Sequence, residues 1–203
     1  MIEDFLSGRL DICILTIPEK SDFPVLDDEK LVKIPLAYKS SVVVVNKDNP
    51  ASELTLDQLS ELFGVSSTNS NLLNWRNFGI SSFSTSMIKA YAVEEDRGIS
   101  SDLFRYVALN STAFGANVQF DQIDEVERMI VQDKTAIGIF PKIPINPNLK
   151  ALFVAKNDES IAYGPSIDNI YYSDYIIRLP FYLIYNIRDT KRLYPIISTL
   201  LSD

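Results

Sequence analysis

Four consecutive valines, Val42 to Val45, constrain the fold of this chain more than any other stretch. Valine is β-branched and favours an extended backbone, and successive side chains of a strand point to opposite faces of its sheet. A strand that is apolar on both sides is stable only where both faces of the sheet are covered, as in the parallel sheets of α/β proteins. The valines therefore predict a buried strand in a mainly parallel sheet.

A turn and a capped helix follow the valines. The segment from Asn46 to Pro50 has the Asn, Asp and Pro content of a turn. Thr55, with Gln58 three residues later, matches a capping box, in which the side chain of each residue satisfies the backbone N–H of the other. The helix is expected to end at Gly64 and to carry a row of apolar residues: Leu56, Leu59, Leu62 and Phe63.

Short apolar segments alternate with amphipathic ones along the rest of the chain. The pattern predicts strands over residues 10–17, 31–38, 41–46, 86–93, 135–140, 150–155 and 179–187. It predicts further helices over residues 1–7, 102–109, 120–132 and 190–202, with a left-handed cap at Gly8 and Trp75 as a core anchor. Alternation of this kind indicates an α/β fold, in which ligands bind at the carboxyl ends of strands.

The composition argues against several classes of function. The chain has no histidine and a single cysteine, Cys13, so it can form neither a Ser-His-Asp triad nor an internal disulfide nor a cysteine-based zinc site. We therefore expect no enzyme, no metal and no cofactor. A net charge of −8 argues against nucleic-acid binding, which relies on Lys and Arg. The sequence has no run of about 18 apolar residues, which a membrane-spanning helix would need. Its acidic first residues do not resemble a signal peptide.

Several motifs occur in one order between Ser7 and Tyr185: "SGRLDICI", then "VVVVN" with "DNP" and the "LTLDQLSELF" helix, then "NW", "TAIGIF" and "YIIRLPFYLIY". In this order they resemble the type II periplasmic-binding-protein fold, and within it the phosphate-binding proteins of ABC importers. The resemblance implies two α/β lobes with mainly parallel sheets and two hinge crossings, near residues 36–41 and 138–150. It places residues 1–41 and 139–203 in lobe I and residues 42–138 in lobe II. Lobe I is expected to be incomplete, because the family's first strand and helix precede the point where this chain begins.

The resemblance also implies a set of ligand contacts. Thr16 falls where the family has a ligand hydroxyl, and Lys39, Ser40 and Ser41 fall at the mouth of the hinge. The family's Arg-x-x-x-Ser-Gly-Thr motif, aligned by the following Phe104, falls on Gly98, Ile99 and Ser100, and its arginine position is Glu94. Arg97 is then the candidate replacement for that arginine, and Ser101 extends the motif.

Each of these candidates also has a purely structural interpretation. The segment from Gly98 to Ser101 offers backbone N–H groups and two hydroxyls at a helix start, which suits an anion, but Ser100 and Ser101 could instead be plain helix N-caps. Thr16 could be satisfied by backbone within its strand. Lys39 and Arg97 could be ordinary solvated cations.

The resemblance implies an extracytoplasmic solute-binding protein that holds phosphate or another small oxyanion between its lobes, is anchored as a lipoprotein and works with an ABC transporter permease. A homodimer through the incomplete lobe I is a further option. Two alternatives are the effector-sensing domain of a LysR-like regulator, which shares the fold, and a scaffold domain of the same fold that has lost binding. Glu94 and the changed motif favour the scaffold alternative.

Overall fold

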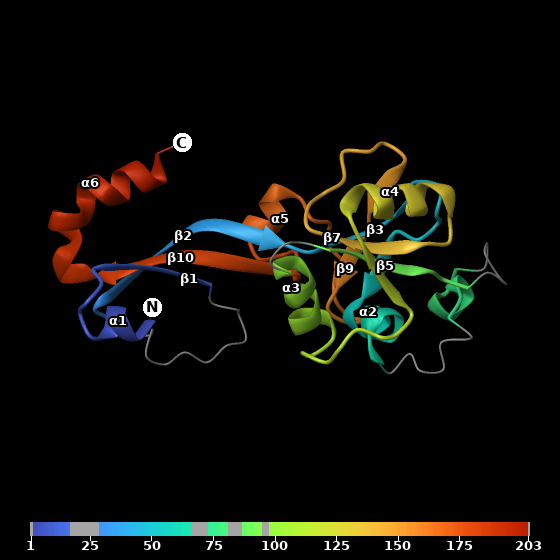
Figure 1. The fold of residues 1–203 in the computed structure, drawn as a ribbon, viewed down its shortest axis with the longest axis horizontal. Coiled ribbons are helices and arrows are strands. Elements are labelled where there is room, and N and C mark those ends of the chain that lie inside the picture. Colours follow the sequence, from blue (N-terminus) through green and yellow to red (C-terminus); the bar gives the residue numbers. More distant parts are fainter. Residues whose placement is uncertain (1, 17–28, 66–72, 81–86, 95–97, 203) are drawn as a thin grey trace. The chain divides into compact units, whose positions relative to one another are not determined.

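The computed structural model describes residues 2–16, 29–65, 73–80, 87–94 and 98–202, which form two compact units (Figure 1). The larger unit spans residues 40–178, and the smaller unit spans residues 1–39 and 179–203. The second crossing was expected near residues 138–150 but lies at Arg178 and Leu179, and that expectation is wrong. Residues 139–178 belong to the larger unit because two of its strands, β3 and β4, find strand partners among them.

The main sheet of the larger unit has five strands in the order β6-β5-β7-β3-β8. Their bounds are β3 Val42–Asn46, β5 Ala90–Val93, β6 Val118–Asp121, β7 Ile137–Phe140 and β8 Leu149–Ala151. Strand β5 is parallel to β6 and β7, whereas β3 is antiparallel to both β7 and β8. The sheet is therefore mixed, and the expected parallel setting of the valine strand is wrong.

The connections explain these strand directions. Helix α3 (Ile99–Ala108) joins β5 to β6, and helix α4 (Ile123–Gln132) joins β6 to β7, so these strands are parallel, as crossover connections require. Strand β3 instead enters directly from β2 (Leu31–Ser40), and no helix separates β7 from β8. Without a helical crossover, neighbouring strands pair antiparallel.

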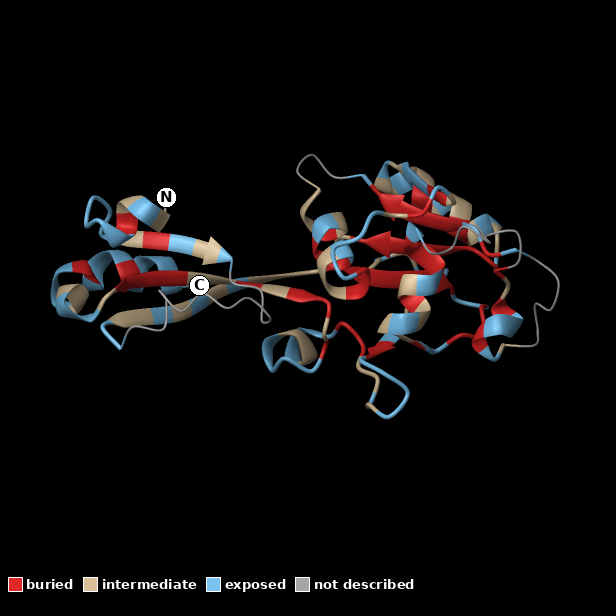
Figure 2. Ribbon diagram, turned by 90° about the horizontal axis from the view of Figure 1, so that it is seen from below, coloured by how far each residue is buried: buried red, intermediate tan, exposed pale blue. Residues whose placement is uncertain are grey.

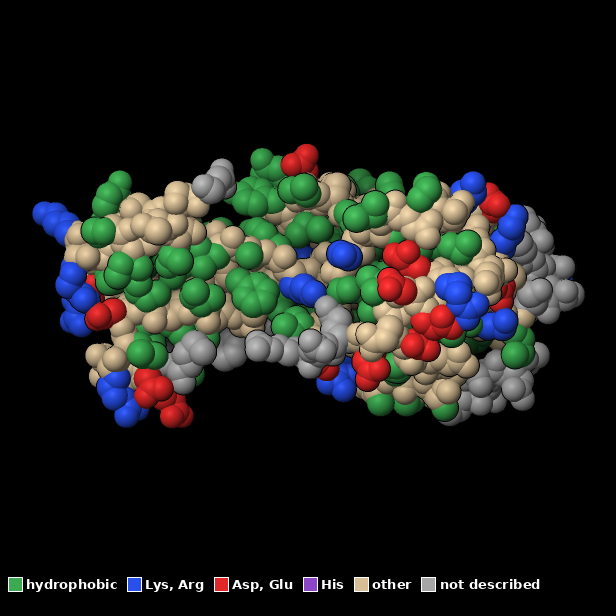
Figure 3. Space-filling model, turned by 45° about the horizontal axis from the view of Figure 1, so that its top comes forward, with side chains coloured by type: hydrophobic (Ala, Val, Ile, Leu, Met, Phe, Trp, Pro, Cys, Tyr) green, Lys and Arg blue, Asp and Glu red, His purple; other side chains and the backbone are tan. Residues whose placement is uncertain are grey.

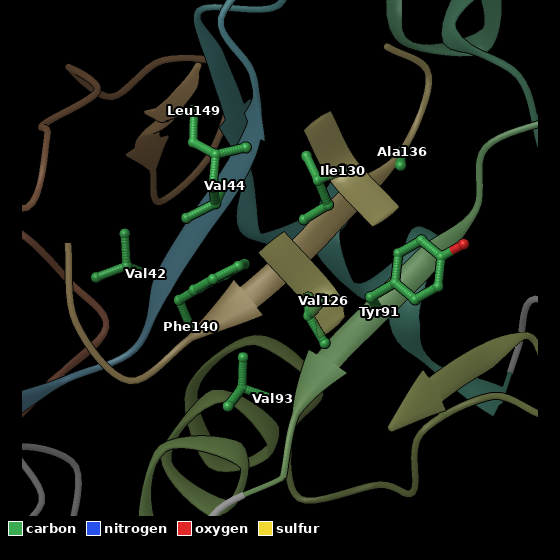
Figure 4. Close-up of a cluster of buried hydrophobic side chains, with 9 residues drawn as sticks. All are labelled: Val42, Val44, Tyr91, Val93, Val126, Ile130, Ala136, Phe140 and Leu149. Carbon is green, nitrogen blue, oxygen red and sulfur yellow. The ribbon is translucent and has the colours of Figure 1, made fainter. Parts of the chain in front are cut away.

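The predicted burial of the valines is confirmed, since each of Val42 to Val45 is 0 % exposed. Val42 and Val44 pack with Val126 and Ile130 of α4 and with Phe140 in one core cluster (Figure 4). Helices α2 (Leu56–Phe63) and α3 lie on the other side of the sheet (Figure 1), where the rings of Phe63 and Phe104 meet edge to face at 5.2 Å. Both faces of the sheet are thus covered by helices, as an all-apolar strand requires.

The polar turn after the valines ties β3 to the end of α4. Asn46 donates from Nδ2 to the carbonyl oxygens of Ile130 and Val131 at 3.1 and 3.0 Å. Asn49, which is 1 % exposed, donates to the carbonyl oxygen of Lys134 at 2.8 Å. The last carbonyls of a helix have no partner within the helix, so these buried amides satisfy groups that burial would otherwise leave without hydrogen bonds.

The predicted capping box is present. The Thr55 N–H donates to Gln58 Oε1 at 2.9 Å, and the Gln58 N–H donates to Thr55 Oγ1 at 3.3 Å. Trp75 is fully buried and donates from Nε1 to the carbonyl oxygen of Thr135 at 2.8 Å, as expected of a core anchor. The remaining elements of the larger unit are β4 (Glu53–Thr55), which pairs in parallel with β9 (Phe153–Ala155), the 3-10 helix η3 (Trp75–Phe78), and α5 (Ile167–Tyr171).

The smaller unit is a three-stranded sheet in the order β1-β10-β2, with a helix packed against each face. Its elements besides β2 are α1 (Ile2–Leu6), β1 (Ile12–Thr16), β10 (Arg178–Asn186), the 3-10 helix η5 (Ile187–Asp189) and α6 (Thr190–Leu201). Phe5 of α1 packs with Cys13 and Ile184, and Leu193 and Ile197 of α6 pack on the opposite face. Gly8 has a φ of 75°, in agreement with the predicted left-handed cap.

Strand β1 is mostly apolar in sequence, but it is not buried on both faces. Within the described residues it pairs with β10 alone, at the edge of its sheet, and Ile14 is 45 % exposed. Buried residues fill the central strands β3 and β7 of the larger unit (Figure 2). Exposed apolar side chains are also seen on the surface (Figure 3). In the smaller unit, α6 packs with Ile12 of β1 but leaves Ile14 exposed.

A pair of hydrogen bonds joins residues near the two ends of the larger unit. The Ser41 N–H donates to the carbonyl oxygen of Ile177 at 3.1 Å. Tyr175, which is fully buried, donates from its hydroxyl to the carbonyl oxygen of Ser41 at 2.8 Å. Burial raises the pKa of the Tyr175 hydroxyl, so it remains a donor throughout the physiological range.

We predict that Tyr175→Phe destabilises the chain by about 1–3 kcal/mol, because it leaves the buried Ser41 carbonyl without this donor. The measurement is urea unfolding followed by circular dichroism. Tyr172→Phe is the control, since Tyr172 is 70 % exposed, and it should change the free energy of unfolding very little. Equal effects of the two substitutions would contradict the role of the Tyr175 hydroxyl.

A second polar cluster surrounds Asp133, which follows α4. Its Oδ1 accepts from the Thr135 N–H at 2.9 Å and from Thr135 Oγ1 at 2.6 Å, and its Oδ2 lies 2.9 Å from Lys89 Nζ. Burial raises the pKa of this carboxyl, but the hydrogen bonds from Thr135 and Lys89 outweigh burial and hold the pKa below its ordinary 3.8. The carboxylate therefore stabilises the fold above pH 3.8, and this stabilisation is lost as the pH falls through the lowered folded-state pKa.

We predict that Asp133→Asn lowers the free energy of unfolding at pH 7 by about 1–2 kcal/mol, since Lys89 is exposed and its share is screened by solvent. The gap between variant and parent should close as the pH falls below the ordinary value of 3.8. Denaturant titrations at a series of pH values measure this, with the exposed Asp57→Asn as the control. A gap independent of pH would show that the carboxylate charge is not the cause.

Candidate functional site

A cavity of about 300 Å³ lies in the larger unit where helix α3 begins. Its lining residues are Glu94, Gly98, Ser101, Asp102, Arg105, Phe114 and Phe120. Glu94 directly follows β5, and its N–H donates to the carbonyl oxygen of Asp121 at the end of β6, at 2.8 Å. The cavity therefore lies at the carboxyl ends of parallel strands, where α/β sheets bind ligands.

Helix α3 starts from a glycine with no side-chain cap. Gly98 is the N-cap, with a φ of 60° in the left-handed region, and the first intrahelical bond runs from the Asp102 N–H to the Gly98 carbonyl oxygen at 2.8 Å. Ser100 and Ser101 are the second and third residues of the helix, so the alternative interpretation of them as N-caps is wrong. Because glycine has no side-chain oxygen to accept from the first turn, the positive end of the helix dipole faces the cavity without such a cap.

The two serines have different surroundings. Ser100 is 2 % exposed and points into the protein, whereas Ser101 is half-buried and lines the cavity. Ile99, between Gly98 and the serines, is half-buried. Of the two predicted hydroxyls, that of Ser101 is the one placed to reach a ligand in this cavity.

Charged side chains of both signs line the cavity. Arg105 Nη2 lies 3.1 Å from Asp102 Oδ1, one helical turn away on α3. Both side chains are exposed, so the ion pair adds little to stability, but Asp102 offsets the positive charge of Arg105. Glu94 adds a second carboxylate, so the described lining residues carry one more negative than positive charge. Among these residues, the groups that suit an anion are the backbone N–H groups at the start of α3 and the Ser101 hydroxyl.

Aromatic rings form the apolar wall of the cavity. The Phe114 ring stacks on that of Phe104 at 6.0 Å and meets the edge of Phe120 at 5.3 Å. Phe104 is fully buried, whereas Phe120 is 45 % exposed. The rings are thus anchored in the core and reach the surface at the cavity.

Of the sequence-predicted site residues, the structure places Gly98 and Ser101 in the lining of the cavity, with Ile99 and Ser100 between them. Thr16 is exposed at the end of β1 in the smaller unit, and Lys39 and Ser40 are half-buried at the end of β2. Arg97 lies outside the described residues. Contact of Thr16, Lys39 and Ser40 with the same ligand stays a prediction.

Ser41 is buried at the boundary of the larger unit. Its side chain is 0 % exposed, and its hydroxyl has no hydrogen-bond partner among the residues that the structure describes. Contact of Ser41 with a ligand stays a prediction.

The sequence analysis missed four lining residues: Asp102, Arg105, Phe114 and Phe120. Asp102 and Arg105 could have been found, because Asp102 lies four residues after Gly98 and Arg105 lies four residues after Ser101, the spacing that shares a helix face. Phe114 and Phe120 gave no signal, since they reach the cavity only through the packing of the segment after α3.

Two other cavities hold none of the predicted site residues. One of about 240 Å³ in the smaller unit is lined by α1, the turn before β1 and η5, including Asp11, Arg188 and Asp189. The other, of about 210 Å³, lies at the carboxyl ends of β4 and β9 and includes Thr55 and Asn157. None of the helices in the described ranges is both long and apolar enough to cross a membrane.

Comparison with solved structures identifies the fold. The chain is similar to an ABC-type phosphate transport receptor from Vibrio cholerae (18 % identity, TM-score 0.68, 100 % of this chain and 78 % of that chain). It is also similar to a possible phosphate binding protein from Planctomyces limnophilus (17 %, TM-score 0.75, 99 % and 73 %) and to PstS from Borrelia burgdorferi (15 %, TM-score 0.74, 100 % and 77 %). At these identities the likeness shows the fold: the two-lobed α/β type II periplasmic-binding-protein fold.

Comparison of sequences adds one relative. Protein SphX from Synechococcus elongatus is 29 % identical over 173 residues, which cover 82 % of this chain and 50 % of that protein. The chain thus spans half the length of this curated relative. No family model matches the chain.

We predict that Ser41→Ala weakens oxyanion binding by about 10- to 100-fold, as expected for loss of a hydrogen bond to a charged group. It should change the free energy of unfolding by less than about 1 kcal/mol, because the buried hydroxyl has no partner in the described structure. Titration calorimetry and urea unfolding measure the two quantities. Ser40→Ala, at the neighbouring candidate position, serves for comparison. Unchanged affinity in Ser41→Ala would remove Ser41 from the site.

Proposed function

We propose that this chain is the solute-binding protein of an ABC importer and that it binds phosphate or another small oxyanion. The observation that carries the proposal is the uncapped start of α3 at Gly98, which opens on a cavity at the carboxyl ends of β5 and β6. Support comes from the fold, which is similar to that of the phosphate transport receptor from Vibrio cholerae.

Binding in this proposal is non-covalent. The first-turn N–H groups of α3 and the Ser101 hydroxyl donate to the oxyanion, and the helix dipole stabilises its charge. Strands β2 and β10 connect the units and are the hinge in this proposal. Thr16, Lys39, Ser40 and Ser41 are proposed as further contacts of the same solute, through charge-assisted hydrogen bonds. No step requires a nucleophile or a general base, so we propose no enzymatic activity.

The proposed setting follows from the proposed role. A solute-binding protein of an importer works outside the cytoplasm, docks on the transporter permease and is held at the membrane by an anchor. These parts of the proposal, together with a homodimer formed through the smaller unit, concern the whole protein.

A scaffold domain of the same fold is the second candidate. Glu94 and Asp102 favour it, because two carboxylates in the lining oppose the binding of an anion. In that case the chain has kept the fold and lost affinity for oxyanions. Calorimetry separates the two candidates directly.

Titration of the purified chain with phosphate and with sulfate tests the proposal. We expect heat of binding for at least one of them, and Ser101→Ala should weaken that binding by about 10- to 100-fold, as expected for loss of a hydrogen bond to a charged group. Ser198→Ala, an exposed helical serine in the smaller unit, is the matched control and should bind like the parent.

Absence of heat from both anions would favour the scaffold candidate. Binding that Ser101→Ala leaves unchanged would keep the function but move the site away from α3.

A further inference from the structure

We draw no further inference here: the strongest candidate, the exposed apolar patch that Ile167, Tyr171 and Tyr172 form on and directly after α5 in the larger unit, carries nothing because nothing in the structure shows what covers it.

Discussion

Keeping both faces of β3 out of water is the constraint on which the larger unit depends. Four valines with no exposed surface need a covering layer on each side and a strand partner on each edge. Helix α4 covers one face and α2 and α3 cover the other, while β7 and β8 provide the edges. The position of α3, and with it the start of the candidate site, follows from this requirement.

The polar turn after β3 helps to position the candidate site, although it does not line the cavity. Asn46 and Asn49 satisfy carbonyl groups at and after the end of α4, which fixes that helix over the sheet. The same helix leads the chain to β7, and β7 pairs with β5, the strand that Glu94 directly follows. A polar turn that looks out of place after four valines thus helps to hold the strand ends at which the cavity forms.

Local signals predicted much of this structure. The capping box of Thr55 and Gln58 is set by neighbouring residues, and the burial of the valines and of Trp75 follows from their apolar side chains; all three are confirmed. The errors concern features that depend on distant residues. The direction of β3 is set by how the chain enters the sheet, and the exposure of β1 is set by how little covers it. The second boundary moved to Arg178 because β8 and β9 pair with strands made far earlier in the chain. At the site, periodicity located α3 but could not show that glycine, rather than serine, occupies its N-cap.

The pairing of β3 also affects how the protein is made. Its partners lie at residues 137–140 and 149–151, so the valines emerge from the ribosome long before either neighbouring strand exists. Contacts so distant in sequence form slowly, and an unpaired apolar strand can associate with other chains in the meantime. The residues that directly follow β3 are Lys47, Asp48, Asn49 and Pro50. Charges and a proline beside a hydrophobic strand hinder stacking with other chains, so this turn protects the nascent chain before it serves the folded one.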